Sequence, residues 1–251
     1  MRKIHFDPKE LQDSMNTLKT SEKVAEKYNC HKETILRKAR DMGLKWPENQ
    51  TNIDHKFFNN WSRRMAYITG FITGDGCIHN KRPYLMIELK KSDRCVIEYI
   101  RDSIKPEAKI YDRNRHNDEF SWSSSRLVLF SQPIINSLKQ YSIFPNKTGK
   151  HKLDFDIPEK YIWDYVRGFF DADGSVFYRH GLINSKLVCK SKDFIYSIHD
   201  LIENLGTINC HKGLYSIAIC YKESLILGQK MYRDEEFCLQ RKKDRFMNPR
   251  L

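Results

Sequence analysis

The sequence predicts an α+β protein made of two pseudo-symmetric repeats, preceded by a small all-α domain. The first observation behind this is an internal duplication, in which AYITGFITGDGCI (66–78) aligns with DYVRGFFDADGSV (164–176). The second is that further segments match in the same order in both copies: 90–100 with 190–202, and 145–148 with 240–243. Matched segments at similar spacing indicate a duplicated unit, too long for a solenoid repeat, and two copies predict an internal pseudo-two-fold axis.

Each repeat is predicted to run in the order αββαββα, with the two first helices packed against each other. We expect these helices to end at Gly76 and Gly174 in left-handed turns. Short β-prone runs predict strands, and apolar residues at helical spacing predict helices. The predicted strands are 83–89, 109–113, 120–124, 175–179, 185–189 and 213–221, and the predicted helices are 96–104, 134–143 and 194–205.

Residues 1–46 predict a separate helix-turn-helix module. Ser21 is suited to cap the first helix, the turn is expected at 29–31, and Gly43 suits the end of the second helix. The second helix either contacts DNA through its polar side or belongs to a helical hairpin whose charged face is only solvated. The residues expected to face inward are Val24, Ala25, Ile35, Leu36 and Ala39. The residues on the polar side are His31, Lys32, Thr34, Arg37, Lys38 and Arg40.

The polar segment 47–60 is predicted to be a linker, so the repeats should occupy 61–150 and 151–251. Positive charge is present on both sides of it, because residues 1–50 hold 11 basic and 8 acidic residues out of totals of 44 and 32. A net charge of +12 is typical of a protein that binds a polyanion, although charge can also serve solubility alone. Its spread argues against a neutral enzyme with one basic arm.

Membrane and secreted classes are not indicated. There is no run of about 18 apolar residues, and the start MRKIHFDPKE lacks the apolar stretch of a secretory signal. The seven cysteines are odd in number and form no C-x-x-C pair, which favours reduced thiols over disulfides or a zinc site. We therefore expect the protein in the cytoplasm of a bacterial or phage-infected cell, or in an organelle.

Small residues in the duplicated segments predict a close helix pair. Gly70 and Gly74 are four residues apart and share one helix face, and Gly168 and Ala172 repeat the pattern. The packed helices would bring together two C-terminal ends, each carrying an aspartate, which both the helix dipoles and mutual repulsion disfavour. Divalent cations that bridge the carboxylates and a phosphate would relieve this. One copy alone would predict only a tight helix crossing, whereas two matched copies in a basic chain favour a nuclease.

The segments ITGFITGDG (68–76) and VRGFFDADG (166–174) resemble the two motifs of the LAGLIDADG endonuclease family. The second is close to the family pattern, and the first departs from it at Thr73 and Gly74. The resemblance covers about residues 61–248. It implies a monomeric homing endonuclease that hydrolyses phosphodiester bonds of double-stranded DNA at a specific site, as in intron homing.

The resemblance also implies a metal site built on the eighth position of each motif. The candidate metal ligands are Asp75 and Asp173, with the backbone carbonyls of Gly74 and Ala172 as additions. Oxygen ligands favour Mg²⁺, for which Mn²⁺ could substitute.

A lysine after each repeat would stabilise the charge of the reacting phosphate or organise the attacking water. The candidates are Lys147 in PNKT and Lys242 in LQRKK, although Arg241 and Lys243 lie close enough to confuse the second assignment. Glu88 and Lys186 lie near positions that support catalytic waters in relatives.

By the same resemblance, the strands should form two saddle-shaped sheets over the major groove, with alternate side chains facing the DNA. Arg and Lys on that face could contact guanine edges or phosphates. The candidates in the repeats are Lys81, Arg82, Lys90, Arg113, Arg115, Arg179, Lys186 and Lys190, and those in the N-terminal module are His31, Lys32, Thr34 and Arg37.

Two other functions stay open beside DNA cleavage. One is a maturase that binds its own intron RNA and assists splicing, and the other is a non-catalytic DNA-binding regulator that uses the N-terminal module. The presence of both Asp75 and Asp173 disfavours each as the sole role. Thr73 in the first motif occupies the position that Asp171 holds in the second, so the two repeats are unequal and a nicking enzyme is also possible. No residues of a protein-splicing element are evident at Met1 or Leu251, which favours a free-standing or intron-encoded protein.

Overall fold

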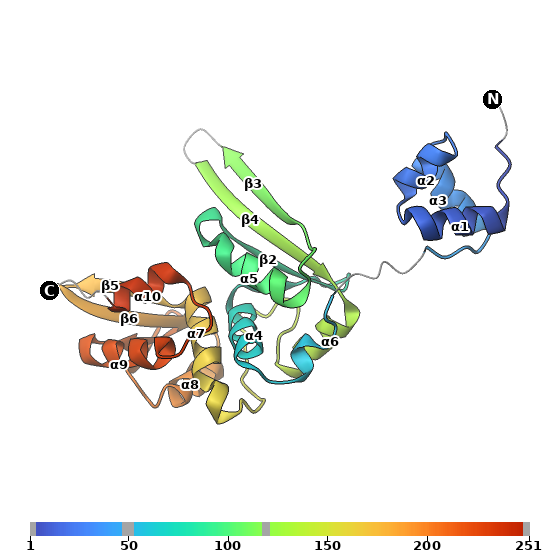
Figure 1. The fold of residues 1–251 in the computed structure, drawn as a ribbon. Helices are drawn as coiled ribbons and strands as arrows, with labels where there is room; N and C mark the ends of the chain where they lie inside the picture. Colours follow the sequence, from blue (N-terminus) through green and yellow to red (C-terminus); the bar gives the residue numbers. More distant parts are fainter. Residues whose placement is uncertain (1–3, 47–52, 117–120, 248–251) are drawn as a thin grey trace. The chain divides into compact units, whose positions relative to one another are not determined.

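The computed structural model describes residues 4–46, 53–116 and 121–247, and the chain divides into two compact units (Figure 1). The first unit spans Met1–Asn52 and the second spans Ile53–Leu251.

The N-terminal unit contains α1 (Pro8–Leu18), α2 (Ser21–Lys27) and α3 (Lys32–Asp41), of which the sequence predicted the last two. Thr20, not Ser21, caps α2, because its hydroxyl accepts the backbone N–H of Lys23 at 3.4 Å. The prediction that Leu36 faces inward is wrong, since its side chain is 39% exposed. Gly43 follows α3 with φ of +67°, the left-handed geometry that glycine tolerates. The core consists of Phe6, Leu11, Met15, Val24, Ala25, Ile35 and Ala39.

The second unit contains two repeats with the same order of elements. The first comprises η1 (Phe57–Asn59), α4 (Arg63–Asp75), β1 (Gly76–Ile78), β2 (Tyr84–Lys90), η2 (Lys91–Asp93), α5 (Arg94–Ile104), β3 (Ile110–His116), β4 (Ser121–Phe130) and α6 (Gln132–Gln140). The second comprises η3 (Glu159–Tyr161), α7 (Ile162–Asp173), β5 (Ser175–Arg179), β6 (Leu182–Cys189), α8 (Lys192–Leu201), β7 (Thr207–His211), β8 (Leu214–Ile219), α9 (Tyr221–Tyr232) and α10 (Gln240–Met247). This confirms the α+β class.

Each repeat holds a four-stranded antiparallel sheet, ordered β1-β2-β4-β3 in the first and β5-β6-β8-β7 in the second. Alternating residues bury one face of each sheet under helices, as Leu85 and Ile87 show in β2. On the other face, which we call the open face, side chains such as Met86 and Glu88 of β2 are only half-buried. The sequence prediction omitted β1 and β7, and Phe120 of its strand 120–124 lies outside the described residues.

The helices α4 and α7 lie side by side between the two sheets (Figure 1). Their backbones touch at two glycines related by the pseudo-symmetry. A methyl group on Gly70 would overlap the carbonyl oxygen of Tyr165, and one on Gly168 would overlap that of Tyr67. The small residues in the motif therefore allow the approach that the sequence predicted.

The glycines that end these helices act differently from the prediction. Gly76 and Gly174 have φ of −74° and −79°, so they are extended residues and not left-handed caps: Gly76 is the first residue of β1, and Gly174 immediately precedes β5. Glycine is needed because of crowding: a Cβ on Gly76 would lie 2.7 Å from the carbonyl oxygen of Ile72, and one on Gly174 would lie 2.5 Å from that of Phe170. The chain thus passes from helix directly into strand.

Part of the predicted linker 47–60 belongs to the first repeat. Ile53 and Phe58 are buried in its core, and the hydroxyl of Tyr141 donates to the carbonyl of Phe58 at 2.7 Å. Residues 47–52 lie outside the described part of the chain. Within the described residues, none of the helices combines the length and the apolar character needed to cross a bilayer.

Candidate active site

Two carboxylates meet where the paired helices end. Asp75 is the last residue of α4 and Asp173 is the last residue of α7. A Cβ on Gly74 would lie 3.0 Å from Oδ2 of Asp173, so this carboxylate lies against the opposite helix. Both residues keep part of their surface accessible to solvent, and none of the described residues donates a hydrogen bond to either carboxylate.

This environment disfavours negative charge. Partial burial raises the pKa of Asp75. Burial and the neighbouring charge of Asp75 raise the pKa of Asp173 to about 6. Two carboxylates that lose hydration without gaining a hydrogen-bond donor are poorly stabilised by the protein alone, and a bound cation would stabilise both.

Two lysines lie beside the carboxylates. The ammonium of Lys147 donates to the carbonyl of Gly74 at 2.5 Å. That of Lys242 donates to the carbonyls of Phe170 and Asp171, each at 2.7 Å. Burial lowers the pKa of both lysines, that of Lys242 to about 8, while the charges of Asp75 and Asp173 act in the opposite direction. Each lysine therefore bonds to its own motif helix and interacts with both carboxylates.

The cations next to Lys242 have other partners. Arg241 forms an ion pair with Asp93 of the first repeat, at 2.9 and 2.7 Å, and Lys243 pairs with Glu235. The geometry thus distinguishes Lys242 from the neighbours that the sequence could not exclude. Lys242 lies in α10, whereas Lys147 lies in a loop of turns, so the two positions match in sequence order but not in local structure.

The available donors fit a hard divalent cation. In the described ranges, no group of three or more His, Cys, Asp or Glu side chains is arranged so that it could hold a metal ion. The donors at this site are therefore the Asp75 and Asp173 carboxylates with nearby backbone carbonyls, all oxygen atoms, and Mg²⁺ accepts such a set with water completing it. The carbonyl of Gly74, a predicted ligand, already accepts the Lys147 amine.

The predicted DNA-contacting residues of the first repeat lie on the open face or edge of its sheet. Lys90 and Arg113 occupy the open side of β2 and β3, opposite Ser124 in register. Lys81 and Arg82 are exposed between β1 and β2, and their backbone N–H groups donate to Nδ1 of His79. Arg115 is in β3, but its side chain lies outside the described part. Glu88 pairs with Arg126 and accepts from Ser124, and no contact connects it to the aspartates in the described structure.

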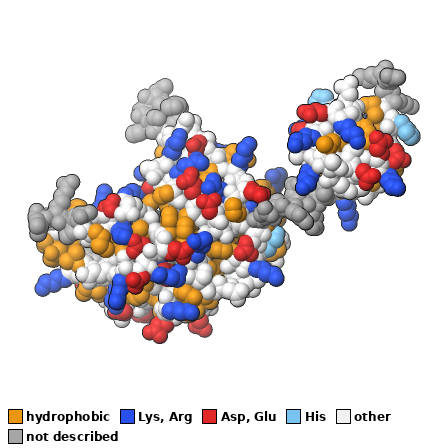
Figure 2. All heavy atoms as spheres, viewed as in Figure 1, with side chains coloured by type: hydrophobic (Ala, Val, Ile, Leu, Met, Phe, Trp, Pro, Cys, Tyr) orange, Lys and Arg blue, Asp and Glu red, His pale blue; other side chains and the backbone are white. Residues whose placement is uncertain are grey.

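The second repeat presents a similar open face. Arg179 and Lys186 lie on the same side of β5 and β6 as the exposed Phe177, and Lys190 follows β6. Lys and Arg side chains are spread over the visible surface of this unit, interspersed with Asp and Glu (Figure 2).

In the N-terminal unit the predicted contact residues lie on α3 or at its start. His31 Nδ1 lies 2.6 Å from Glu33, and Lys32 pairs with Glu22 at 3.3 Å. Arg37 and Arg40 are exposed, and Thr34 is half-buried.

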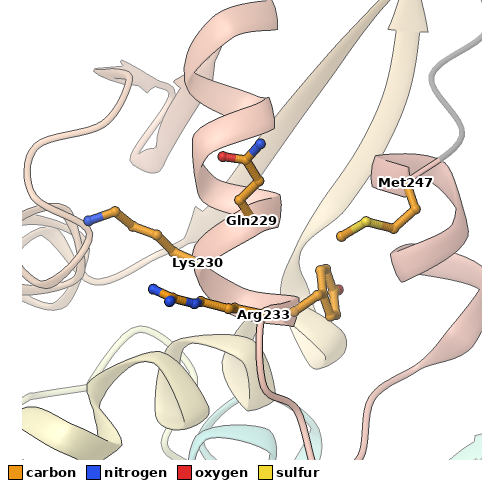
Figure 3. Close-up of a pocket in the computed structure, with 5 residues that line it drawn as sticks. Gln229, Lys230, Arg233 and Met247 are labelled. Atoms are coloured by element: carbon orange, nitrogen blue, oxygen red, sulfur yellow. The ribbon is translucent and has the colours of Figure 1, made fainter.

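A cavity of about 520 Å³ lies away from the carboxylate pair, between the end of α9 and α10 (Figure 3). Its described lining residues are Gln229, Lys230, Tyr232, Arg233 and Met247, which include two cations and no acid. Because none of the described residues that line this cavity is an Asp, Glu, His or Cys, we place the candidate active site at Asp75 and Asp173.

Several buried or half-buried charged residues that the sequence did not single out make contacts around the paired helices. Asp93, the partner of Arg241, joins the two repeats beside Asp75. Asp164 and Arg167 form a buried ion pair at 2.5 Å within α7. Asp171 belongs to the second motif, but the residues that form hydrogen bonds with its side chain are distant in the sequence. No local signal marks the other three.

Part of the sequence matches a known family model, and the fold is similar to those of solved proteins. Residues 161–226 match the family model of the LAGLIDADG-like domain. The fold is similar to that of the homing endonuclease I-WcaI bound to its DNA recognition sequence, with a TM-score of 0.53 and 18% identity over 83% of this chain and 97% of that one. It is also similar to the LAGLIDADG homing endonuclease I-GzeII in complex with a DNA target, with a TM-score of 0.50 and 15% identity over 75% and 88% of the chains.

Curated relatives from Methanocaldococcus jannaschii share part of the sequence. A probable translation initiation factor IF-2 is 25% identical over 67% of this chain, and a reverse gyrase is 28% identical over 74%. The chain spans only 14% and 11% of the length of these two proteins. The shared part is therefore a segment within each of them.

The molecule is an α+β protein whose two repeats pack through paired helices that end in aspartates. Its second repeat matches the family model of the LAGLIDADG-like domain, and its fold is similar to those of the homing endonucleases I-WcaI and I-GzeII.

Proposed function

We propose that the chain is a site-specific, divalent-metal-dependent endonuclease that cuts both strands of a DNA target. The observation that carries this is the Asp75–Asp173 pair, two carboxylates without hydrogen-bond donors among the described residues, at the contact of two helices and next to two lysines. The structures of I-WcaI and I-GzeII are complexes with their DNA targets, which supports double-stranded DNA as the partner.

Asp75 and Asp173 would hold the metal with water and backbone oxygens. A bound divalent cation would polarise the scissile phosphate and lower the pKa of an attacking water. Lys147 and Lys242 hold positive charge where negative charge develops on the phosphate. With a pKa of about 8, Lys242 remains mostly protonated at neutral pH, yet it can release its proton more readily than a surface lysine.

The repeats differ in sequence, so an asymmetric target suits a monomer of this kind better than a perfect palindrome. The open faces of the two sheets, which carry Lys90, Arg113, Arg179 and Lys186, are the surfaces that we assign to the DNA. The exposed cations of α3 would extend this contact and raise the affinity by tethering a second binding module.

The decisive test is cleavage of a randomised double-stranded DNA library in Mg²⁺, with Ca²⁺ as the non-catalytic control. Asp75→Asn and Asp173→Asn should each lose roughly 10²–10³-fold in cleavage rate, because each removes the charge that holds the metal. Asp102→Asn, on the outer helix α5, is the matched control and should cut as the native protein does.

Sequence-specific cuts that disappear in both active-site variants would support the proposal. A protein that binds DNA but leaves it uncut in Mg²⁺ and Mn²⁺ alike would overturn it. In that case the DNA-binding regulator or the RNA-binding maturase becomes the better account.

A further inference from the structure

Asp171, the sixth residue of the second motif, is a buried carboxylate with three hydrogen-bond donors. Its Oδ2 accepts from the hydroxyl of Tyr67 at 2.8 Å and from the backbone N–H of Leu239 at 2.7 Å. Its Oδ1 accepts from the hydroxyl of Tyr232 at 3.3 Å. One side chain therefore connects α7 to α4, to the end of α9 and to the residue that precedes α10.

These contacts lead directly to Lys242. Leu239 opens the first turn of α10, because its carbonyl accepts the backbone N–H of Lys242 at 2.8 Å. The ammonium of Lys242 then returns to α7, where one of its two acceptors is the backbone carbonyl of Asp171. Asp171 thus fixes the start of this turn through its side chain and holds the amine through its backbone. Lys242 is only 4% exposed as a result.

The first repeat lacks this arrangement. Thr73 occupies the position of Asp171, and the hydroxyl of Tyr165 lies 3.3 Å from it, which mirrors the contact of Tyr67 with Asp171. The hydroxyl of Thr73, however, donates to the carbonyl of Thr69 within its own helix, at 2.9 Å. Among the described residues, no motif side chain of this repeat bonds to the loop that carries Lys147, whose side chain is half-buried.

We propose that Asp171 is a positioning residue that holds Lys242 against its motif helix, and that Thr73 at the matching place leaves Lys147 less constrained. The two half-sites are then unequal, and the strand served by Lys242 is cut before the other. A group held in place by its surroundings loses less freedom in the transition state, so the constrained lysine acts faster. The order of strand cleavage rests on the proposed function, whereas the positioning of Lys242 does not.

The positioning is tested without metal or DNA by measuring how fast acetic anhydride modifies each lysine, with peptide mass spectrometry as the readout. Asp171→Thr copies the first repeat and removes the anchor of Leu239. It should speed the modification of Lys242 by about tenfold, the effect of losing one hydrogen bond at a buried charged group, and leave Lys147 unchanged. Asp171→Asn keeps the shape and one acceptor oxygen, and should protect Lys242 nearly as well as the native residue does.

The control for general loosening is Ser224→Ala, which removes a buried hydroxyl bonded to Ser185 and Ile219 in the same repeat. Lys242 should stay protected in this variant. The proposal is overturned if Lys242 remains as protected in Asp171→Thr as in the native protein, or if Ser224→Ala exposes it equally.

The strand order is tested on a target labelled separately on each strand. The native protein should accumulate a nicked intermediate in which one strand is cut. Asp171→Thr should slow the cleavage of that strand until both strands are cut at similar rates. The proposed order of strand cleavage would be overturned if the native protein cut both strands at equal rates, or if Asp171→Thr slowed the cleavage of both strands by the same factor. If the native protein cuts neither strand, the proposed function fails, while the modification experiment still decides whether Asp171 positions Lys242.

Discussion

His151 is a buried imidazole close to the loop that carries Lys147, and it is 8% exposed. Burial, together with the charge of Lys147, lowers its pKa from 6.5 to about 4. The folded protein therefore keeps this ring neutral at a pH where the unfolded chain protonates it. Because the folded pKa is the lower one, the stability is complete above pH 6.5 and declines as the pH falls towards 4.

His151→Asn should remove this contribution to the pH dependence. Between pH 7.5 and pH 5 the native protein should lose about 2 kcal/mol more in free energy of unfolding than the variant does, since the shift spans more than one pKa unit in that window. Urea unfolding of both proteins at the two pH values measures the difference. Equal losses would show that the ring is protonated in the folded state and that its pKa is not lowered.

The sequence predicted the positions of the helix-terminal residues Asp75 and Asp173, but it did not predict the contacts of Asp171. Asp75 and Asp173 could be placed at helix ends because the motif and its spacing are local in the sequence, and α4 and α7 do end there. The contacts of Asp171 are not local, since its partners Tyr67 and Leu239 are 104 and 68 positions away. Only folding brings them together.

At the scale of elements, the contact of α4 with α7 depends on Gly70 and Gly168. Gly70→Ala would place a methyl group on the carbonyl of Tyr165 and 3.0 Å from the backbone nitrogen of Phe169. Backbone atoms cannot move aside as a flexible side chain can, so the helices must separate, at a cost of about 3 kcal/mol in free energy of unfolding. Chemical unfolding measures this.

Gly181→Ala is the matched control for that change. Gly181 has φ of +78° in the turn between β5 and β6, with nothing within 4 Å of an added Cβ. The control should lose only about 1 kcal/mol, the cost of a left-handed conformation for alanine. Similar losses in the two variants would mean that the helix contact can relax, and that the glycines are not what holds α4 and α7 together.

The sequence predicted those helices and strands whose pattern of apolar residues is contained within the element itself. Alternating apolar residues predicted a strand at 83–89, and β2 spans Tyr84–Lys90. β1 has only three residues, which is too short for such a pattern, and it forms because Gly76 leads the chain from α4 onto the edge of β2. The matched segments 145–148 and 240–243 are a loop and a helix, and Asp171 bonds only to the residue that precedes the second.

At the scale of the whole molecule, the net charge of +12 and the exposed cations of both units predict salt-dependent binding to DNA. If α3 contacts the backbone of the target, Arg37→Ala with Arg40→Ala should lower the slope of log affinity against log salt by about 2, one for each lost phosphate contact. The carboxylate pair lies in the other unit, so the cleavage rate at saturating protein should not change.

Lys9→Ala with Lys19→Ala removes the same charge from α1 and from the residue that follows it, and leaves α3 intact. This control should keep the native slope, because net charge alone contributes little once salt screens it. Fluorescence anisotropy titrations of the target at several salt concentrations give both slopes. Equal changes in the two double variants would mean that the N-terminal unit acts only through its charge and that α3 is not a DNA-contacting helix. A smaller slope for the α3 variant alone would assign that helix to the DNA.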